Sequence, residues 1–122
     1  MNFYKCERCK NIIIHVKEER VPVSCCHELM KLLVPNTEDA AREKHVPVVT
    51  KTDNVAIVEI GSVPHPMIDV HYIEWIVLET NKGYYIKHLN PGDLPKAQFN
   101  LTENEEILAA YEHCNLHGLW KK

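Results

Sequence analysis

The pattern of hydrophobic and polar residues predicts mostly short β-strands. Residues 54–60 are rich in β-branched side chains, and residues 68–80 alternate between apolar and polar positions as a half-buried strand does. The turn signal Asn81-Lys82-Gly83 follows, so residues 84–89 are expected to return as the second strand of a hairpin. A further strand is expected over residues 96–101. The pattern therefore predicts a fold dominated by antiparallel strands.

Two other segments have helical features. Residues 105–113 place apolar side chains at helical spacing, but a strand is favoured there because regularly spaced short strands suggest a β-sandwich. Thr37 is a suitable N-cap for one helical turn over residues 38–42, whose first positions are acidic. The expected fold class is therefore all-β, with at most one short helix.

The first 34 residues differ from the rest of the chain. They offer only short strand candidates, at residues 12–14, 21–23 and 29–34. A unit of this size buries too little apolar surface to be stable alone, so a metal is expected to hold it together. Val34-Pro35 is a suitable boundary, because proline restrains the preceding residue to an extended conformation. We therefore expect domains at 1–34 and 35–122.

Composition and charge exclude several classes of protein. Hydrophobic residues make up 45% and charged residues 25% of the 122 residues, as in globular proteins. A net charge of -3 provides no basic field for nucleic acid or an anionic membrane. No apolar run is long enough to span a bilayer, and the first residues lack the apolar core of a signal peptide. We therefore expect a cytoplasmic protein.

The five cysteines indicate metal binding. An odd number without a signal peptide argues against a disulfide scaffold. Four of them lie near the start of the chain, as Cys-x2-Cys, a 15-residue gap and an adjacent pair: Cys6, Cys9, Cys25 and Cys26. Four thiolates suit a tetrahedral site for either zinc or a single iron, and ligand type alone does not decide between the two metals.

A second group of metal-ligand residues lies in the rest of the chain. Cys114 and His117 are three residues apart, within reach of one ion. Three further histidines lie beside prolines or on the expected long strand: His45, His65 and His71. A lone histidine is more often structural than a ligand. The residues alone therefore indicate a mixed His/Cys site and leave open which histidines belong to it.

At these residues the chain resembles the two-iron superoxide reductases, the desulfoferrodoxin family. The four N-terminal cysteines match the family's desulforedoxin-like module, including the gap and the adjacent pair. The catalytic module is matched in order by four segments: Glu43-Lys44-His45-Val46-Pro47, Pro64-His65-Pro66, His71-Tyr72-Ile73-Glu74-Trp75 and Cys114-Asn115-Leu116-His117-Gly118-Leu119-Trp120. The first and last of these are highly specific to the family.

The resemblance implies a small desulforedoxin-like domain followed by an immunoglobulin-like β-sandwich, as a homodimer. It implies two mononuclear iron centres. The ligands of centre I would be Cys6, Cys9, Cys25 and Cys26, and those of centre II would be His45, His65, His71, His117 and Cys114. The implied activity is one-electron reduction of superoxide to hydrogen peroxide, with rubredoxin or a similar protein as the electron donor.

The resemblance also implies roles for the two residues before His45. Lys44 would attract superoxide and help to supply a proton, and Glu43 would assist release of the product. Without the motif, Glu43 and Lys44 would be a solvated pair on a loop. The chain departs from the family at Lys10 and His27, where glycine is common. Non-glycine residues at positive φ cost on the order of 1 kcal/mol each, which is small beside metal binding.

Two alternative functions remain open at the level of sequence. The protein could be an electron carrier that uses only an iron bound by the four N-terminal cysteines, or a zinc-stabilised binding module without chemistry. The metal content would separate them: two irons per chain favour the reductase, iron in the N-terminal site alone favours the carrier, and zinc alone excludes both iron proteins.

Overall fold

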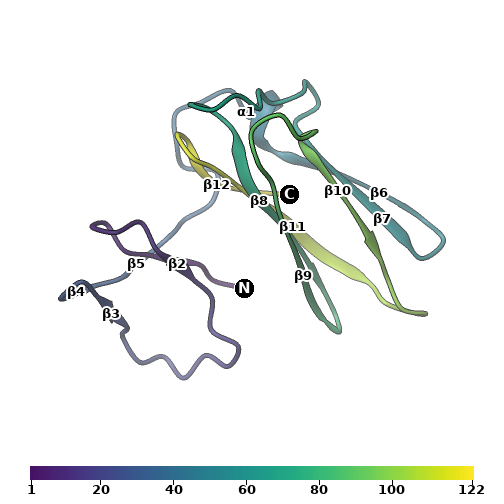
Figure 1. Ribbon diagram of the computed structural model, residues 1–122. Helices are drawn as coiled ribbons and strands as arrows, with labels where there is room; N and C mark the ends of the chain where they lie inside the picture. Colours follow the sequence, from purple (N-terminus) through teal and green to yellow (C-terminus); the bar gives the residue numbers. More distant parts are fainter. The chain divides into compact units, whose positions relative to one another are not determined.

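The computed structural model describes all 122 residues and divides into two compact units, Met1–Val34 and Pro35–Lys122 (Figure 1). None of its helices is long and apolar enough to cross a membrane.

The N-terminal unit consists of very short strands. These are β1 (Tyr4–Lys5), β2 (Ile12–Ile13), β3 (Ser24–Cys25), β4 (Glu28–Leu29) and β5 (Lys31–Leu32). They form a three-stranded sheet in the order β2-β1-β5 and a separate β3-β4 hairpin. Only Phe3 and Cys6 of this unit are buried. The unit therefore has almost no hydrophobic core.

Two of the strand predictions in this unit were wrong in detail. No strand forms over 21–23, where Pro22 has no N–H to donate, and β3 begins only at Ser24. The predicted strand over 29–34 is divided between two partners, because β4 pairs with β3 whereas β5 pairs with β1.

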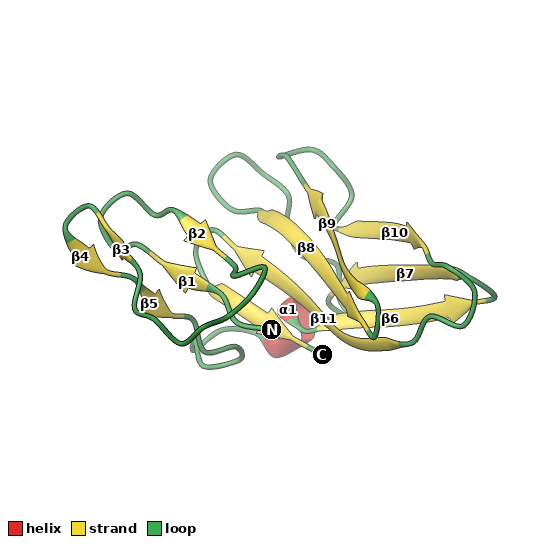
Figure 2. Ribbon diagram, turned by 90° about the horizontal axis from the view of Figure 1, so that it is seen from below, coloured by secondary structure: helices red, strands yellow, loops and turns green.

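The C-terminal unit is a sandwich of two antiparallel sheets (Figure 2). One sheet has the order β10-β7-β6 and the other the order β12-β11-β8-β9. The strands are β6 (Pro47–Thr52), β7 (Val55–Ile60), β8 (Ile73–Thr80), β9 (Gly83–His88), β10 (Lys96–Asn100), β11 (Ile107–Cys114) and β12 (Gly118–Lys121). The predicted strand over 105–113 is confirmed as β11.

The core of this unit lies between the two sheets. Alternate residues of β7 face inward and are buried: Ala56, Val58 and Ile60. They belong to one hydrophobic cluster with Ile76 and Leu78 of β8 and with Phe99 of β10. Full burial of an aliphatic side chain contributes about 1.5–3 kcal/mol. The sandwich therefore has a core of its own, unlike the N-terminal unit.

Two further predictions differ from the structure near the histidines. The helical turn is α1 (Arg42–His45), and not 38–42: the hydrogen bond that closes it runs from Val46 N to Arg42 O (2.9 Å). The predicted strand over 68–80 begins only at Ile73. Before it, Ile68 and His71 exchange two backbone hydrogen bonds of 3.0 Å and form a tight turn. His71 therefore lies in a loop and not on a strand.

Candidate metal centres

The loops at one end of the sandwich bring the C-terminal metal-ligand candidates together. His45 is the last residue of α1, and His65 and His71 lie in the connection between β7 and β8. Cys114 ends β11 and is paired with both Gly118 and Ile73, so the Cys114–His117 turn lies beside the start of β8. Residues as distant in sequence as His45 and His117 therefore meet at one place.

Four imidazole rings form a closed cycle at this place. The ring centroids are separated by 4.7 Å (His45–His65), 4.6 Å (His65–His71), 5.1 Å (His71–His117) and 5.0 Å (His117–His45). Each neighbouring pair meets edge to face, with interplanar angles of 75° to 83°. The four rings therefore surround one point, and ring nitrogens of His45, His65 and His71 lie within 4.8 Å of one another.

Hydrogen bonds fix which nitrogen of two of these rings is available. Nδ1 of His45 donates to Ala41 O (2.7 Å), and Nδ1 of His65 donates to Pro66 O (2.6 Å). Nε2 of each ring then carries the lone pair. Nε2 of His65 and Nε2 of His71 are buried and have no hydrogen-bond partner. Unpartnered buried nitrogens are costly, and a metal ion would satisfy both, so the residues fit a metal centre.

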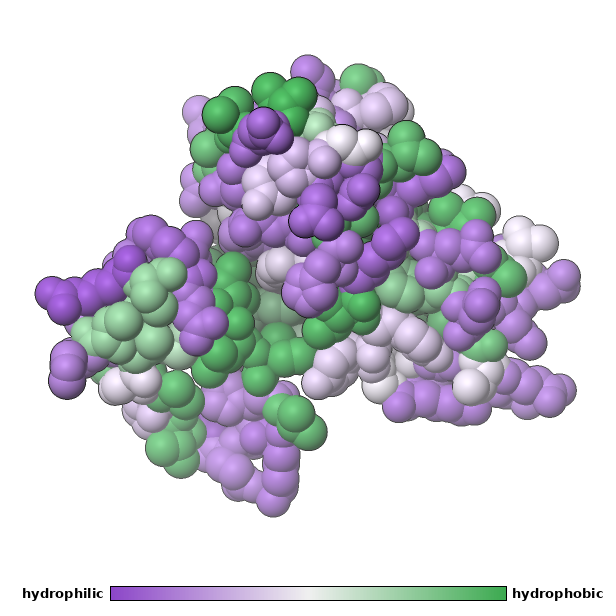
Figure 3. Space-filling view, in the orientation of Figure 1, coloured by the Kyte–Doolittle hydropathy of each residue, from purple (hydrophilic) through white to green (hydrophobic).

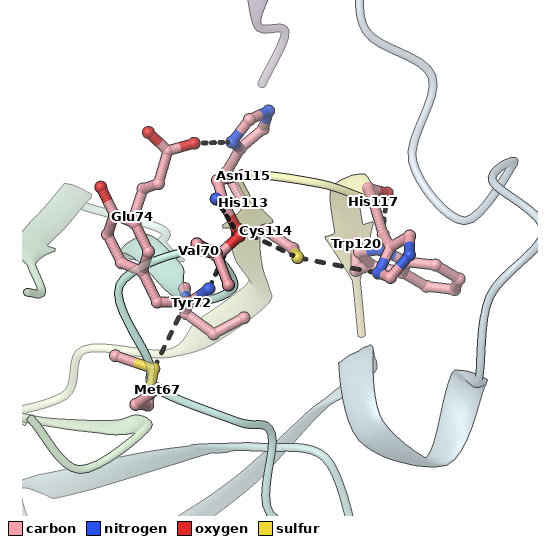
Figure 4. Close-up of polar contacts among 10 residues, drawn as sticks. Met67, Val70, Tyr72, Glu74, His113, Cys114, Asn115, His117 and Trp120 are labelled. Carbon is pink, nitrogen blue, oxygen red and sulfur yellow. Dashed lines mark hydrogen bonds and ion pairs between the residues drawn. The ribbon is translucent and has the colours of Figure 1, made fainter. Parts of the chain in front are cut away.

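Cys114 supplies a sulfur atom to the same group. It is buried, and its Sγ lies within 4.8 Å of ligand nitrogens of His45, His65 and His71. His117 Nδ1 is 3.9 Å from Cys114 Sγ (Figure 4). The same nitrogen is 3.1 Å from Nε2 of His45. The structure thus brings together all five residues proposed for centre II. Their assignment as ligands stays a prediction.

Burial favours the neutral form of three of the imidazoles. It lowers the pKa of His65 to about 4, and it is also the main cause of the lowered pKa of His45 and of His71. Burial raises the pKa of the Cys114 thiol, whereas backbone N–H groups of His117 and Leu116 oppose that rise. Neutral imidazoles have the free lone pairs that metal binding requires, so the nitrogen donors are ready for an ion at neutral pH.

Asn115 holds the His71 loop against the Cys114 turn. Its Oδ1 accepts a hydrogen bond from Tyr72 N (3.0 Å), and its Nδ2 donates to Val70 O (3.1 Å), as Figure 4 shows. Its backbone N–H also donates to Tyr72 O (3.2 Å). The side chain therefore binds the backbone on both sides of His71 and fixes the distance between His71 and Cys114.

Trp120 supports two of the histidines directly. Its ring stacks on His45 (4.8 Å between centroids, 27° between planes), and its Nε1–H donates to His117 O (3.0 Å). Trp75 lies elsewhere: it stacks on His113, whose Nδ1 is 2.8 Å from Glu74 Oε1 (Figure 4). Trp120 is therefore the tryptophan that lines the histidine cluster.

Glu43 and Lys44 lie in α1 beside His45, and both are exposed. The charge of Lys44 contributes to the lowered pKa of His71, and the charge of Glu43 acts in the opposite direction on the pKa of His45. Both charges therefore act on the histidine cluster. Exposed apolar residues lie in the neighbouring loop: Val63, Ile68 and Val70. Figure 3 shows hydrophobic and hydrophilic residues mixed at this end of the C-terminal unit.

The four N-terminal cysteines form the second group. Their sulfur atoms all lie within 4.8 Å of one another, and none forms a disulfide. Cys9 Sγ is 3.6 Å from Cys25 Sγ, and Cys9 N donates to Cys6 Sγ (3.5 Å). This backbone hydrogen bond is the main reason why the pKa of Cys6 falls to about 7. Four convergent thiols suit a tetrahedral metal.

Two residues near these cysteines have the backbone conformation that glycine normally supplies. Lys10 has φ 67° and His27 has φ 62°. Lys10 N donates to Cys6 O (3.0 Å), which closes the turn between Cys6 and Cys9. The chain therefore accepts a small conformational cost at both positions in order to aim the sulfurs at one point.

Comparison with known proteins places the chain in a family. The sequence model of the desulfoferrodoxins matches residues 37–122. The chain belongs to the desulfoferrodoxin family. It is 48% identical to a desulfoferrodoxin from Syntrophotalea carbinolica over 120 residues, which cover 98% of this chain and 94% of that protein. It is 47% identical to a desulfoferrodoxin from Nitratidesulfovibrio vulgaris over 118 residues, which cover 97% and 92%.

A solved structure agrees with this family membership over nearly the whole chain. The superoxide reductase from Treponema pallidum superposes with a TM-score of 0.82 at 37% identity and covers 98% of both chains. The predicted all-β fold, with a desulforedoxin-like unit and a sandwich, is confirmed. The four-cysteine group and the group of four histidines with one cysteine also match the two iron centres of desulfoferrodoxins.

Proposed function

We propose that this protein is a superoxide reductase, whose reaction is the one-electron reduction of superoxide. The overall change is one superoxide, one electron and two protons converted to one hydrogen peroxide. The observation that carries the proposal is the closed cycle of four imidazoles beside the buried Cys114 thiol. A structural zinc site uses four ligands, whereas this group offers five donors.

Five side chains would bind the metal, and hydrogen bonds hold them in position. His45, His65, His71, His117 and Cys114 would hold iron, which supplies a one-electron couple and one open coordination position when bound. The Nδ1 hydrogen bonds of His45 and His65 keep their Nε2 atoms aimed inward. The backbone N–H groups of Leu116 and His117 stabilise the thiolate form of Cys114. The framework is therefore preorganised, and ion binding demands little movement of the side chains.

Lys44 and Glu43 are proposed to act on the substrate and product. Because the chain carries a net charge of -3, its overall field does not attract superoxide. A local cation must do so, within a Debye length of about 8 Å at physiological salt. Lys44 is proposed to provide this charge, because it is exposed and directly precedes His45 in α1. Glu43, the exposed carboxylate next to it in α1, would assist release of the product.

The yield of hydrogen peroxide tests the proposed function. The iron-loaded, reduced protein is expected to form one hydrogen peroxide per superoxide consumed, with one electron taken from the protein or its donor. A dismutase would form one hydrogen peroxide per two superoxide ions and would consume no donor. Superoxide generated by pulse radiolysis, with peroxide assayed afterwards, distinguishes the two stoichiometries. Failure of the reduced protein to consume superoxide would contradict the proposal.

Replacing Lys44 tests the proposed attraction of the anion. Lys44→Ile is expected to lower the second-order rate constant for superoxide, most strongly at low ionic strength, because salt screens the missing charge. Lys87→Ile is the matched control, since Lys87 is an exposed lysine on β9. Pulse radiolysis over a range of salt concentrations measures both. Equal rate constants for Lys44→Ile and the wild type would remove Lys44 from the mechanism.

The partners and arrangement complete the proposal. The two units are proposed to act as separate domains, 1–34 carrying centre I and 35–122 carrying centre II. The electron donor is proposed to be rubredoxin or a similar small redox protein, and the protein is proposed to be a cytoplasmic homodimer. Light scattering at several concentrations tests the dimer, and stopped-flow reduction of the ferric protein by rubredoxin tests the donor.

A further inference from the structure

Gly61 packs closely against the backbone of Glu43 and Lys44. Gly61 follows the last residue of β7, is buried and has φ +82°. A Cβ atom at this position would lie 2.7 Å from Glu43 O and 2.8 Å from the carbonyl carbon of Lys44. It would also lie 2.4 Å from Val63 O. All three neighbours are backbone atoms, so none can rotate away as a flexible side chain would.

The same loop holds Glu43 by hydrogen bonds. Val63 N donates to Glu43 O (2.9 Å), and Ser62 Oγ donates to the same oxygen (3.3 Å). Two residues later the loop reaches His65, whose own N–H contacts Ile60 O at 3.4 Å. The backbone of Glu43 is therefore joined to the loop that carries one of the imidazoles of the cluster.

We propose that Gly61 is a positioning residue for the reaction: it lets the Glu43–Lys44 backbone approach the His65 loop and so sets where the Lys44 cation and the Glu43 carboxylate stand relative to the histidine cluster. The proposal rests on the proposed function, because it concerns the two residues assigned to superoxide and its product. Glycine is required for two separate reasons, the positive φ and the missing Cβ. The second reason is the one that matters for position.

A second glycine separates these two reasons. Gly92 has φ +90°, close to that of Gly61, but a Cβ atom there would meet nothing within 4 Å. Gly92→Ala therefore imposes a similar backbone strain without pushing on another segment. Gly61→Ala imposes the strain and also displaces the Glu43–Lys44 backbone. A property changed by Gly61→Ala and unchanged by Gly92→Ala is therefore not a general effect of positive-φ strain.

The experiment compares iron-loaded wild type, Gly61→Ala and Gly92→Ala. We expect Gly61→Ala to lower the second-order rate constant for superoxide by about ten- to a hundredfold, as displacements of about 1 Å do. Its rate constant should also depend less on ionic strength, because Lys44 is displaced. Gly92→Ala should keep the rate constant and the salt dependence of the wild type. The iron content and thermal unfolding of each variant are measured in parallel.

Hydrogen exchange provides a readout that does not depend on activity. Pro64 and Pro66 have no amide proton, so exchange in the segment 61–66 reports mainly on Val63 and its nearest neighbours. Gly61→Ala should exchange faster in this segment than the wild type, because the Val63–Glu43 hydrogen bond is broken, and Gly92→Ala should not. If the wild type proved inactive toward superoxide, the proposed function would fail while this exchange result still tested the position of the loop.

Ser62→Ala keeps the inference testable if Gly61→Ala does not fold. It removes one of the two donors to Glu43 O without backbone strain and should slow the reaction about two- to fivefold, the effect of one modest hydrogen bond. The inference is overturned if Gly61→Ala matches the wild type in rate constant, salt dependence and exchange. It is also overturned if both glycine variants lose activity equally, or if Gly61→Ala does not fold and Ser62→Ala reacts like the wild type.

Discussion

The two metal centres are built on opposite principles. In the N-terminal unit, only Phe3 and Cys6 are buried, and Cys6 is itself a metal-ligand candidate. In the C-terminal unit, a hydrophobic cluster between two sheets exists independently of the histidines. The first centre is therefore expected to hold its domain together, whereas the second is held in position by its domain. A domain whose fold does not depend on its metal does not need protein ligands at every coordination position, so one position can be left for a substrate.

Metal removal is the strongest test of this contrast. On chelation, amides of residues 1–34 are expected to lose their protection from hydrogen exchange almost completely, because that unit cannot form a core without its metal. Amides of β7, β8 and β11 should stay protected. Hydrogen exchange measured by mass spectrometry before and after chelation decides. Zinc added back should restore the N-terminal unit without restoring superoxide reduction, and collapse of both units would contradict the contrast.

A pair of serine variants tests whether the centres are independent. Cys114→Ser should abolish the visible absorption of the ferric second centre and the reaction with superoxide, because a serine oxygen replaces the only sulfur donor there. Cys9→Ser should abolish the absorption of the first centre alone. Visible spectra and iron content of the two variants measure this. A change at both centres in either variant would show that the two sites depend on each other.

Asn115 tests how far the second centre depends on its framework. Asn115→Ala removes the hydrogen bonds to Tyr72 N and Val70 O, and it should lower the free energy of unfolding by about 1–3 kcal/mol. It should also weaken iron binding, since His71 lies between those two residues. Asn115→Asp keeps the acceptor and loses the donor, so an intermediate result is expected. Denaturant unfolding and iron content measure both variants, and a wild-type result for Asn115→Ala would exclude this role.

The contrast also explains how much could be predicted from the sequence. The four-cysteine group follows from local spacing, because Cys-x2-Cys and the adjacent pair each lie within one turn. The strands 54–60, 84–89 and 96–101 were predicted within one residue of β7, β9 and β10, since turns with glycine or proline delimit them. Choosing His45, His65 and His71 needed the resemblance, because their meeting depends on how the sandwich pairs distant segments.

Other features gave no signal in the sequence. His71 was placed on a long strand because residues 68–72 continue the alternation, but the backbone hydrogen bonds between Ile68 and His71 form a turn there. The sequence of β11 gives no sign that Glu112 is buried. Its carboxyl group has no hydrogen-bond partner, and burial raises the pKa of this group well above its usual range. Both features depend on how segments distant in the sequence pack together, which no local sequence pattern reveals.

The smallest expected effect concerns Glu105, which contributes to the stability of the sandwich independently of any metal. The buried Glu105 carboxylate accepts hydrogen bonds from Thr80 Oγ1 (2.5 Å), Thr102 N (2.8 Å) and Tyr85 OH (2.9 Å). The Thr80 hydroxyl is the main cause of the lowered pKa of Glu105, about 2. Because the folded pKa lies below the unfolded value of about 4.3, the stabilisation is complete above that value. It is lost as the pH falls toward 2.

Glu105→Gln should therefore unfold more easily than the wild type at pH 7, and the difference should shrink on acidification. Hydrogen exchange of the β8 and β11 amides in increasing denaturant, at several pH values, measures it. A difference that is constant with pH would mean that Glu105 acts by shape alone.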